Sequence, residues 1–169
     1  MKILQESSYS VLKKGILSVL FLLCFSCTSK AAPEWQLAKT LSSYSPCYNF
    51  ARLHFPVENI SDGLEIELDH TMSGLRMYVN VFSITLKPAP IDCSSFPVKL
   101  KKCEEEKVFE GTLLQGNQRV LLPAEAKEYF IQGLLEGSDI EVTAGRYKGF
   151  ITADNFCKLY NEFISIPLP

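Results

Sequence analysis

The sequence predicts an α+β fold, mainly an antiparallel β-sheet or sandwich with two helices of the C-terminal half packed on it. Three observations lead to this prediction. Six to eight short segments alternate apolar and polar residues and are separated by turn residues, which is typical of strands. Two later segments repeat apolar residues at helical spacing. The regular alternation of strands with long helices, which marks a parallel doubly wound fold, is missing from the sequence.

The predicted strands follow from this alternation and from the turns between them. Leu64–Leu68 is the clearest, because its three apolar residues face one way and acidic residues lie between them. Leu75–Leu86 is apolar on both faces over its middle, as expected of a central strand, and the prolines that follow end it. The other predicted strands are Tyr48–Phe55, Val98–Lys102, Lys107–Leu114, Arg119–Leu122, Ile140–Thr143 and Arg146–Thr152.

Two helices are predicted among the later strands. Pro123 suits the first position of a helix, and Gly137 suits the position just after its end. Between them, apolar residues recur on one helical face: Ala126, Phe130, Ile131, Leu134 and Leu135. Asp154 is expected to cap a short final helix. One side of that helix is lined by Phe156, Leu159, Tyr160 and Phe163.

The first 26 residues read as a cleavable signal segment. Its start is positively charged, and an apolar run follows from Gly15 to Phe25. As a helix rising about 1.5 Å per residue, this run is too short to cross a hydrocarbon core of about 30 Å. No later segment approaches the roughly 18 apolar residues that a membrane span needs. The chain is therefore expected to be exported, with no transmembrane helix in the mature protein.

Residues 25–28 (FSCT) resemble the lipobox of bacterial lipoprotein precursors, in which a small residue precedes the cysteine that is lipidated. That family usually has Leu three positions before the cysteine and a small residue two before it, where this chain has Cys24 and Phe25. The resemblance implies a palmitate-type lipid anchor on Cys27. It also implies that Thr28 directs the protein to the periplasmic side of the outer membrane.

Two processing sites therefore remain open. Ordinary signal cleavage after Ala31 is the alternative to lipidation, and it would leave a soluble periplasmic or secreted protein. The predicted organisation is a signal peptide (1–26), a polar tether (27–46) and a single β-rich globular domain (47–169).

Beyond residue 27, the chain has 14 basic residues (17 − 3) and 18 acidic ones (19 − 1), a net charge of −4. This acidic balance without a basic run argues against a nucleic-acid partner.

Four cysteines follow the leader, at Cys47, Cys93, Cys103 and Cys157. An even number in an exported chain suggests two disulfides, and three pairings are possible. The favoured pairing joins Cys93 to Cys103 and Cys47 to Cys157. A zinc site is not favoured, because these cysteines contain no close pair and no nearby His completes a ligand set.

No catalytic motif and no cofactor site are found. Glu65, Glu67 and Asp69 share one face of a predicted strand, and carboxylates two residues apart lie about 7 Å apart there. That geometry could serve a hydrolase or a calcium ion, but it is also what any solvent-facing strand shows, and solvent is the favoured interpretation.

A second candidate surface lies at the predicted hairpins. Arg119, Arg146, Tyr147 and Lys148 are expected to form a small recognition patch for an anionic partner.

Together these observations predict an exported, lipid-anchored envelope protein that is not an enzyme. It would contact the membrane through its anchor and act as a binding or assembly module for an envelope partner. The alternatives are a small periplasmic hydrolase that uses the acidic strand face, and a β-barrel that binds a small ligand.

Overall fold

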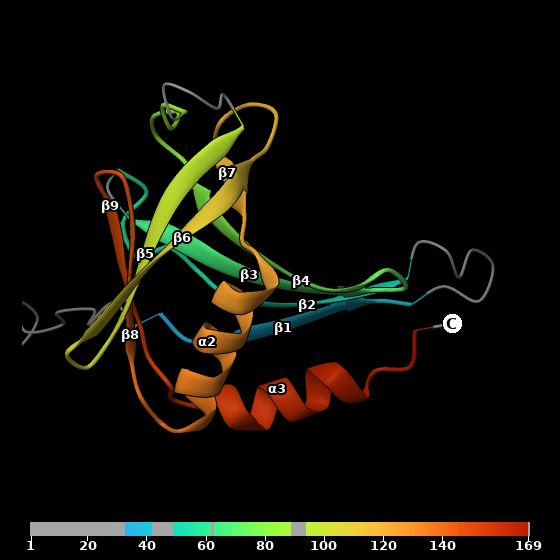
Figure 1. Ribbon diagram of the computed structural model, residues 1–169. Coiled ribbons are helices and arrows are strands. Elements are labelled where there is room, and N and C mark those ends of the chain that lie inside the picture. The colour runs from blue at the N-terminus through green and yellow to red at the C-terminus, as the bar shows by residue number, and fades with distance from the viewer. Residues whose placement is uncertain (1–32, 42–48, 62, 89–93, 169) are drawn as a thin grey trace, which may run out of the picture. The chain divides into compact units, whose positions relative to one another are not determined.

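The computed structural model describes residues 33–41, 49–61, 63–88 and 94–168. All of them belong to one compact unit, which begins at Pro33. The unit is an α+β fold with nine antiparallel strands and two helices (Figure 1). This confirms the predicted fold class, with a single sheet rather than a sandwich of two.

The nine strands form one sheet in the order β1-β2-β3-β4-β7-β6-β5-β8-β9. Every neighbouring pair in this order is antiparallel. The strands are β1 (Gln36–Thr40), β2 (Phe50–Phe55), β3 (Leu64–Thr71), β4 (Gly74–Val81), β5 (Ser95–Lys102), β6 (Glu105–Leu113), β7 (Arg119–Leu121), β8 (Ile140–Ala144) and β9 (Tyr147–Ile151).

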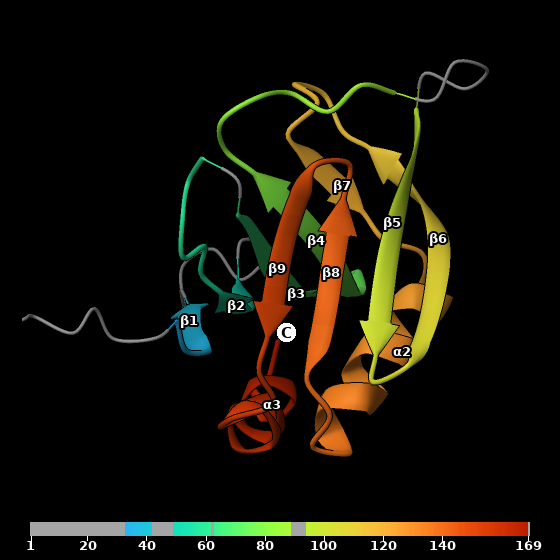
Figure 2. The ribbon, with the colours of Figure 1, turned by 90° about the vertical axis from the view of Figure 1, so that its left-hand side faces the viewer.

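The sheet curls strongly, so that its last strands face its early ones. Figure 2 shows β8 and β9 in front of β3 and β4. Gly149 of β9 permits this approach, because a Cβ atom there would lie 2.8 Å from Cδ1 of Leu64 on β3. A larger residue at this position would require the buried Leu64 side chain to move.

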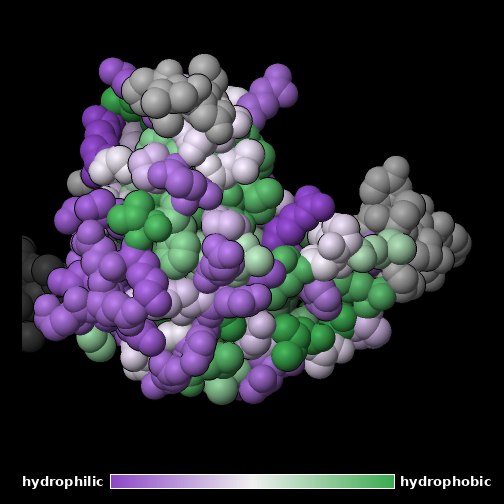
Figure 3. Space-filling view, in the orientation of Figure 1, coloured by the Kyte–Doolittle hydropathy of each residue, from purple (hydrophilic) through white to green (hydrophobic). Residues whose placement is uncertain are grey.

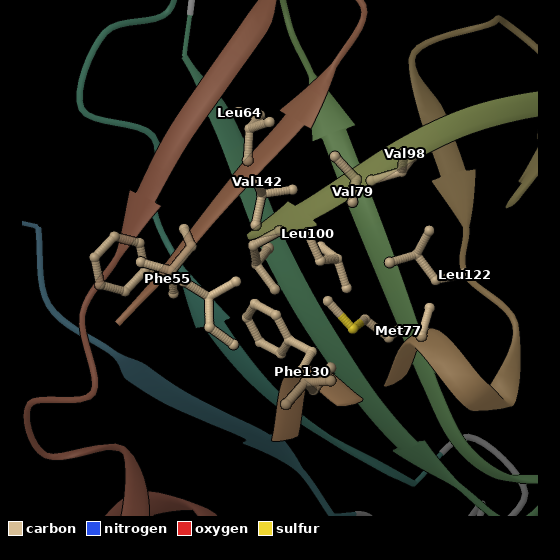
Figure 4. Close-up of a cluster of buried hydrophobic side chains, with 14 of the residues drawn as sticks. Phe55, Leu64, Met77, Val79, Val98, Leu100, Leu122, Phe130 and Val142 are labelled. Atoms are coloured by element: carbon tan, nitrogen blue, oxygen red, sulfur yellow. The ribbon is translucent and has the colours of Figure 1, made fainter. Parts of the chain in front are cut away.

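The core fills the inside of the curled sheet. Alternate residues of most strands point inward, and they pack with Leu122, which follows β7, and with Phe130 of the next helix. Figure 4 labels nine of the core residues: Phe55, Leu64, Met77, Val79, Val98, Leu100, Leu122, Phe130 and Val142. Helix α2 (Ala124–Leu135) contributes Phe130, which is fully buried. The outer side of the β5–β6 hairpin is mostly exposed, and hydrophilic residues dominate that part of the surface in Figure 3.

Helix α3 (Phe156–Ser165) packs on β1, β2 and α2. Its start differs from the prediction: Asn155, with a φ of 60°, occupies the N-cap position, and no side chain caps the helix. Asp154 is therefore not the cap. Helix α2 ends as predicted, with Gly137 adopting a positive φ of 80° just beyond it.

Two predicted boundaries are wrong. The strand predicted at Leu75–Leu86 ends at Val81, because residues 82–86 turn away to contact other loops. The polar tether predicted for residues 27–46 contains a strand: β1 pairs with β2 along its whole length, and Trp35 before it is buried. The described domain therefore begins well before residue 47.

Trp35 fixes the start of this domain to its core. Its ring packs against Phe55, Phe130 and Phe156, with centroid distances of 5.3, 6.4 and 4.8 Å. Its indole N–H donates to the carbonyl oxygen of Thr152 at 2.9 Å. One side chain thus joins β2, α2, α3 and the end of β9.

We expect Trp35→Ala to lower the free energy of unfolding by about 3–5 kcal/mol, because it removes a buried indole and leaves a cavity. Urea unfolding of the purified protein measures this loss. Leu41→Ala is the control, since Leu41 is 51% exposed and its truncation should change stability by less than about 0.5 kcal/mol. Equal and small losses for the two variants would mean that residues 33–41 are a loose tether after all.

Candidate functional site

The acidic face of β3 is not open to solvent. Glu67 is only 2% exposed, and the side chains of Glu65 and Asp69 are partly buried. The expectation of a solvated face is therefore wrong. Two arginines cause the burial: Arg52 from the adjacent β2, and Arg119, which reaches from β7 across β4.

Both guanidinium groups bind the same two carboxylates. Arg52 lies 2.7 Å from Oε1 of Glu67 and 2.8 Å from Oδ1 of Asp69. Arg119 lies 2.8 Å from the same Glu67 oxygen and 3.3 Å from Oδ2 of Asp69. The Arg119 guanidinium also stacks over the Tyr78 ring, 3.8 Å from its centroid.

Asn80 completes this arrangement from β4. Its amide N–H₂ donates to Oε2 of Glu67 at 2.7 Å and to Oε1 of Glu65 at 3.2 Å. His54 lies at the periphery, with Nδ1 3.8 Å from Oε2 of Glu65. We call Arg52, Glu65, Glu67, Asp69, Asn80 and Arg119 the ion-pair cluster.

Burial raises the pKa of the Glu67 carboxyl above its ordinary value, while the hydrogen bond from Asn80 and the two arginines act in the opposite direction. A raised carboxyl pKa can mark a catalytic acid. Here, however, hydrogen bonds and ion pairs already occupy the Glu67 oxygens. The chemistry of the cluster is that of a structural tie between β2, β3, β4 and β7.

A groove of about 300 Å³ lies elsewhere, along β9. One wall is formed by Arg146 and by Lys148–Ile151 of β9. The residues of the other wall come from the end of β2, the start of β3 and the segment between them: Phe55, Pro56, Glu58, Asn59, Gly63 and Leu64. Phe55 and Leu64 supply apolar surface, and Pro33 lies at the rim. The groove is the seam at which the curled sheet approaches closure without pairing β9 to a further strand.

Hydrogen bonds hold the groove in place at one end. Ser83 donates to the carbonyl oxygen of Ser61 at 2.9 Å and lies 3.2 Å from the Tyr147 hydroxyl. Tyr147 in turn donates to the carbonyl oxygen of Ile84 at 2.7 Å and accepts from its N–H at 2.8 Å. At the other end, Trp35 is bound to Thr152. Both walls are thus fixed to the rest of the domain.

The predicted recognition patch is only partly compatible with this geometry. Tyr147 is 2% exposed and its hydroxyl is occupied, so it is a buried anchor and not a surface residue. Arg119 is engaged by the ion-pair cluster, whereas Arg146 contacts Ser83 and Tyr147 beside the groove. Among the described residues, the structure gives no contact that would bring Arg119 and Arg146 together.

Sequence reasoning included Lys148 in the recognition patch but missed Phe150, which lines the groove with it. The signal was present, because Tyr147, Gly149 and Ile151 alternate with them and point inward. Phe150 therefore sits on the polar side of its strand, where it is 62% exposed. A large aromatic residue in such a place is a common sign of a binding surface.

The cysteine predictions fall largely outside the described residues. Cys24, Cys27, Cys47 and Cys93 all do, whereas Cys103 and Cys157 are exposed and form no disulfide with each other. Cys93 nevertheless adjoins Ser94, and β5 then runs extended as far as Lys102. At about 3.3 Å per residue, its two ends, Ser95 and Lys102, lie roughly 23 Å apart. A disulfide needs Cα atoms within about 7 Å, so the extended strand argues against this pairing.

The described residues show neither a metal site nor a membrane span. No three His, Cys, Asp or Glu side chains among them are grouped to hold a metal ion. Within the same residues, no helix is long and apolar enough to cross a membrane. Comparison with known proteins gives no match, whether with family models, curated proteins or solved structures.

We expect Glu67→Gln to lower the free energy of unfolding by about 2–3 kcal/mol, because it leaves two partly buried arginines without their shared carboxylate. Glu106→Gln is the matched control. It removes an exposed ion pair with Lys99 on the outer side of the sheet and should cost less than about 1 kcal/mol. If chemical denaturation gave the two variants equal stability, the cluster would not be a structural tie.

We also expect Cys93 and Cys103 not to be linked to each other. Proteolysis under non-reducing conditions, followed by peptide mass mapping, should find no peptide pair that joins them. The link between Cys47 and Cys157 remains a prediction that the same map tests. Recovery of the Cys93–Cys103 pair from folded protein would mean that β5 does not extend from Ser95 to Lys102.

Proposed function

We propose that this chain is an exported, lipid-anchored protein of the bacterial cell envelope, on the periplasmic side of the outer membrane, whose domain is a non-enzymatic binding module. The observation that carries the binding role is the groove along β9. It combines a strand with one edge that no other described strand pairs, apolar surface and exposed basic side chains between two fixed walls. Such a feature is a common place for a partner to bind.

The start of the domain is compatible with both processing sites. Lipidation at Cys27 and cleavage after Ala31 both cut before Pro33, the first residue of the compact unit. Either event would leave Trp35 and β1 in place. The anchor itself rests on the resemblance of residues 25–28 to a lipobox.

The two alternative functions receive less support from the geometry. A hydrolase would need a free carboxylate on β3, whereas Glu67 and Asp69 are held by Arg52 and Arg119. A ligand-carrying barrel would need an enclosed apolar cavity. Here core side chains fill the inside of the curled sheet, as Figure 4 shows.

We expect the membrane-associated form to begin at Cys27 and to carry the added mass of a diacylglycerol and an acyl chain. Intact-mass measurement of protein extracted from membranes tests this. Cys27→Ser should abolish the added mass and release the protein from membranes. Cys24→Ser is the matched control and should change neither property, because Cys24 would be removed with the leader. A measured mass that matches an unmodified chain beginning at Ala32 would contradict the proposed lipid anchor.

A further inference from the structure

We infer that the groove along β9 takes an extended, acidic polypeptide segment of a partner protein, which adds to the open edge of β9 as a further strand. This inference rests on the proposed role as a binding module and names the partner's chemistry. Addition of a strand uses main-chain hydrogen bonds for affinity and side-chain pockets for specificity. Both elements are present in the groove.

The main-chain element follows from the β8–β9 turn. Gly145, with a φ of 62°, and Arg146 form a two-residue turn, so Ala144 and Tyr147 face each other as a hydrogen-bonded pair. In an antiparallel ladder such pairs alternate with pairs that are not hydrogen bonded. The N–H and C=O groups of Lys148 and Phe150 therefore point away from β8, toward the groove.

No strand among the described residues uses these outward groups, since β9 is the last strand of the sheet. Two donors and two acceptors thus stand in a row, spaced at every second residue. That is the pattern presented by a free strand edge, and it pairs with another extended chain. A compact ligand could hydrogen bond with only some of these outward N–H and C=O groups.

The side-chain element comes from the two walls. Phe55 and Leu64 line the inner part of the groove, so apolar residues of an added strand would point inward at alternate positions. Phe150 stands on the outer face, where the intervening residues of the added strand would pack against its ring. The binding segment should therefore alternate, with apolar residues at every second position.

The groove is lined by two basic side chains, Arg146 and Lys148, and one acidic side chain, Glu58, so its charge favours an acidic segment over a basic one. Lys148 lies in the middle of the open edge, and its side chain is 69% exposed despite an ion pair with Glu141 at 3.3 Å. Arg146 adds a second cation at the end of the groove. A lysine at this place also opposes pairing with a second copy of β9, which would bring like charges together. An acidic strand is the complement of this edge.

The test is a selection of random heptapeptides displayed on phage against the purified protein, followed by affinity measurements on synthetic peptides. Two variants distinguish the contribution of main-chain hydrogen bonding to peptide binding from the contribution of the lysine charge. Lys148→Pro removes the outward N–H and the charge, and proline is tolerated at this edge position because no bond to β8 is lost. Lys148→Ala removes only the charge. Emission of the buried Trp35 and the unfolding midpoint report whether each variant is folded.

We expect selected peptides to be rich in Asp and Glu and to alternate apolar residues. Lys148→Pro should weaken their binding at least tenfold more than Lys148→Ala does. Their binding should also slow hydrogen exchange of the Lys148 and Phe150 amides. If Lys148→Pro does not fold, Phe150→Pro with Phe150→Ala as its control makes the same comparison, because Phe150 also faces outward.

Two results would overturn the inference. Peptides that bind in the groove but lose equal affinity with Pro and Ala at position 148 would leave the binding module in place and remove strand addition. Recovery of no peptide that protects the β9 amides would remove both strand addition and the groove as the site of the proposed function. The mass of the anchored form tests the membrane anchor independently of either result.

Discussion

The approach of β9 to β3 is the constraint on which the rest of this structure depends. Leu64 can pack against the backbone of β9 only because position 149 has no side chain. The contact lies where one sheet curls around its own core, on which α2 and α3 also pack. The curled sheet does not close through a ladder between β9 and β3, and the groove lies beside β9 at this place.

The outer face of the sheet is held by a different interaction. Arg52 and Arg119 come from strands on either side of Glu67 and share its carboxylate, so the cluster bridges four strands. Hydrophobic burial shapes the inside of the curl, whereas paired charges fix the outside. Among the described strands, β9 at one end of the sheet and β1 at the other each keep one edge that no strand pairs.

Much of the fold could be predicted because periodicity is a local property. The alternation in β3 and the helical spacing around Phe130 are visible within a few residues. β1 was missed because its neighbour β2 buries it little: four of its five residues are exposed, and alternation is weak. Gln36–Thr40 forms a strand because it pairs with β2, and a local sequence pattern does not reveal such pairing.

The site was harder to predict because its parts are far apart in the sequence. Glu67 looked solvated because nothing near it indicates that Arg119, 52 residues later, reaches over β4 to cover it. The groove likewise joins residues 55–64 to residues 146–151. Within the local sequence, only the aromatic Phe150 on the polar side of its strand indicated a binding surface. That interpretation also requires knowing that β9 is the last strand of the sheet.

Burial of Trp35 has a consequence for where the groove can work. With a lipid on Cys27, only six residue steps separate the membrane from Pro33 at the rim of the groove. At about 3.5 Å per residue, the chain reaches no farther than roughly 20 Å. A tether of twenty residues would have let the domain sample much of the surrounding space. If Cys27 carries a lipid, this short tether would keep the β9 edge beside the bilayer, and a partner would have to present its segment at the membrane surface.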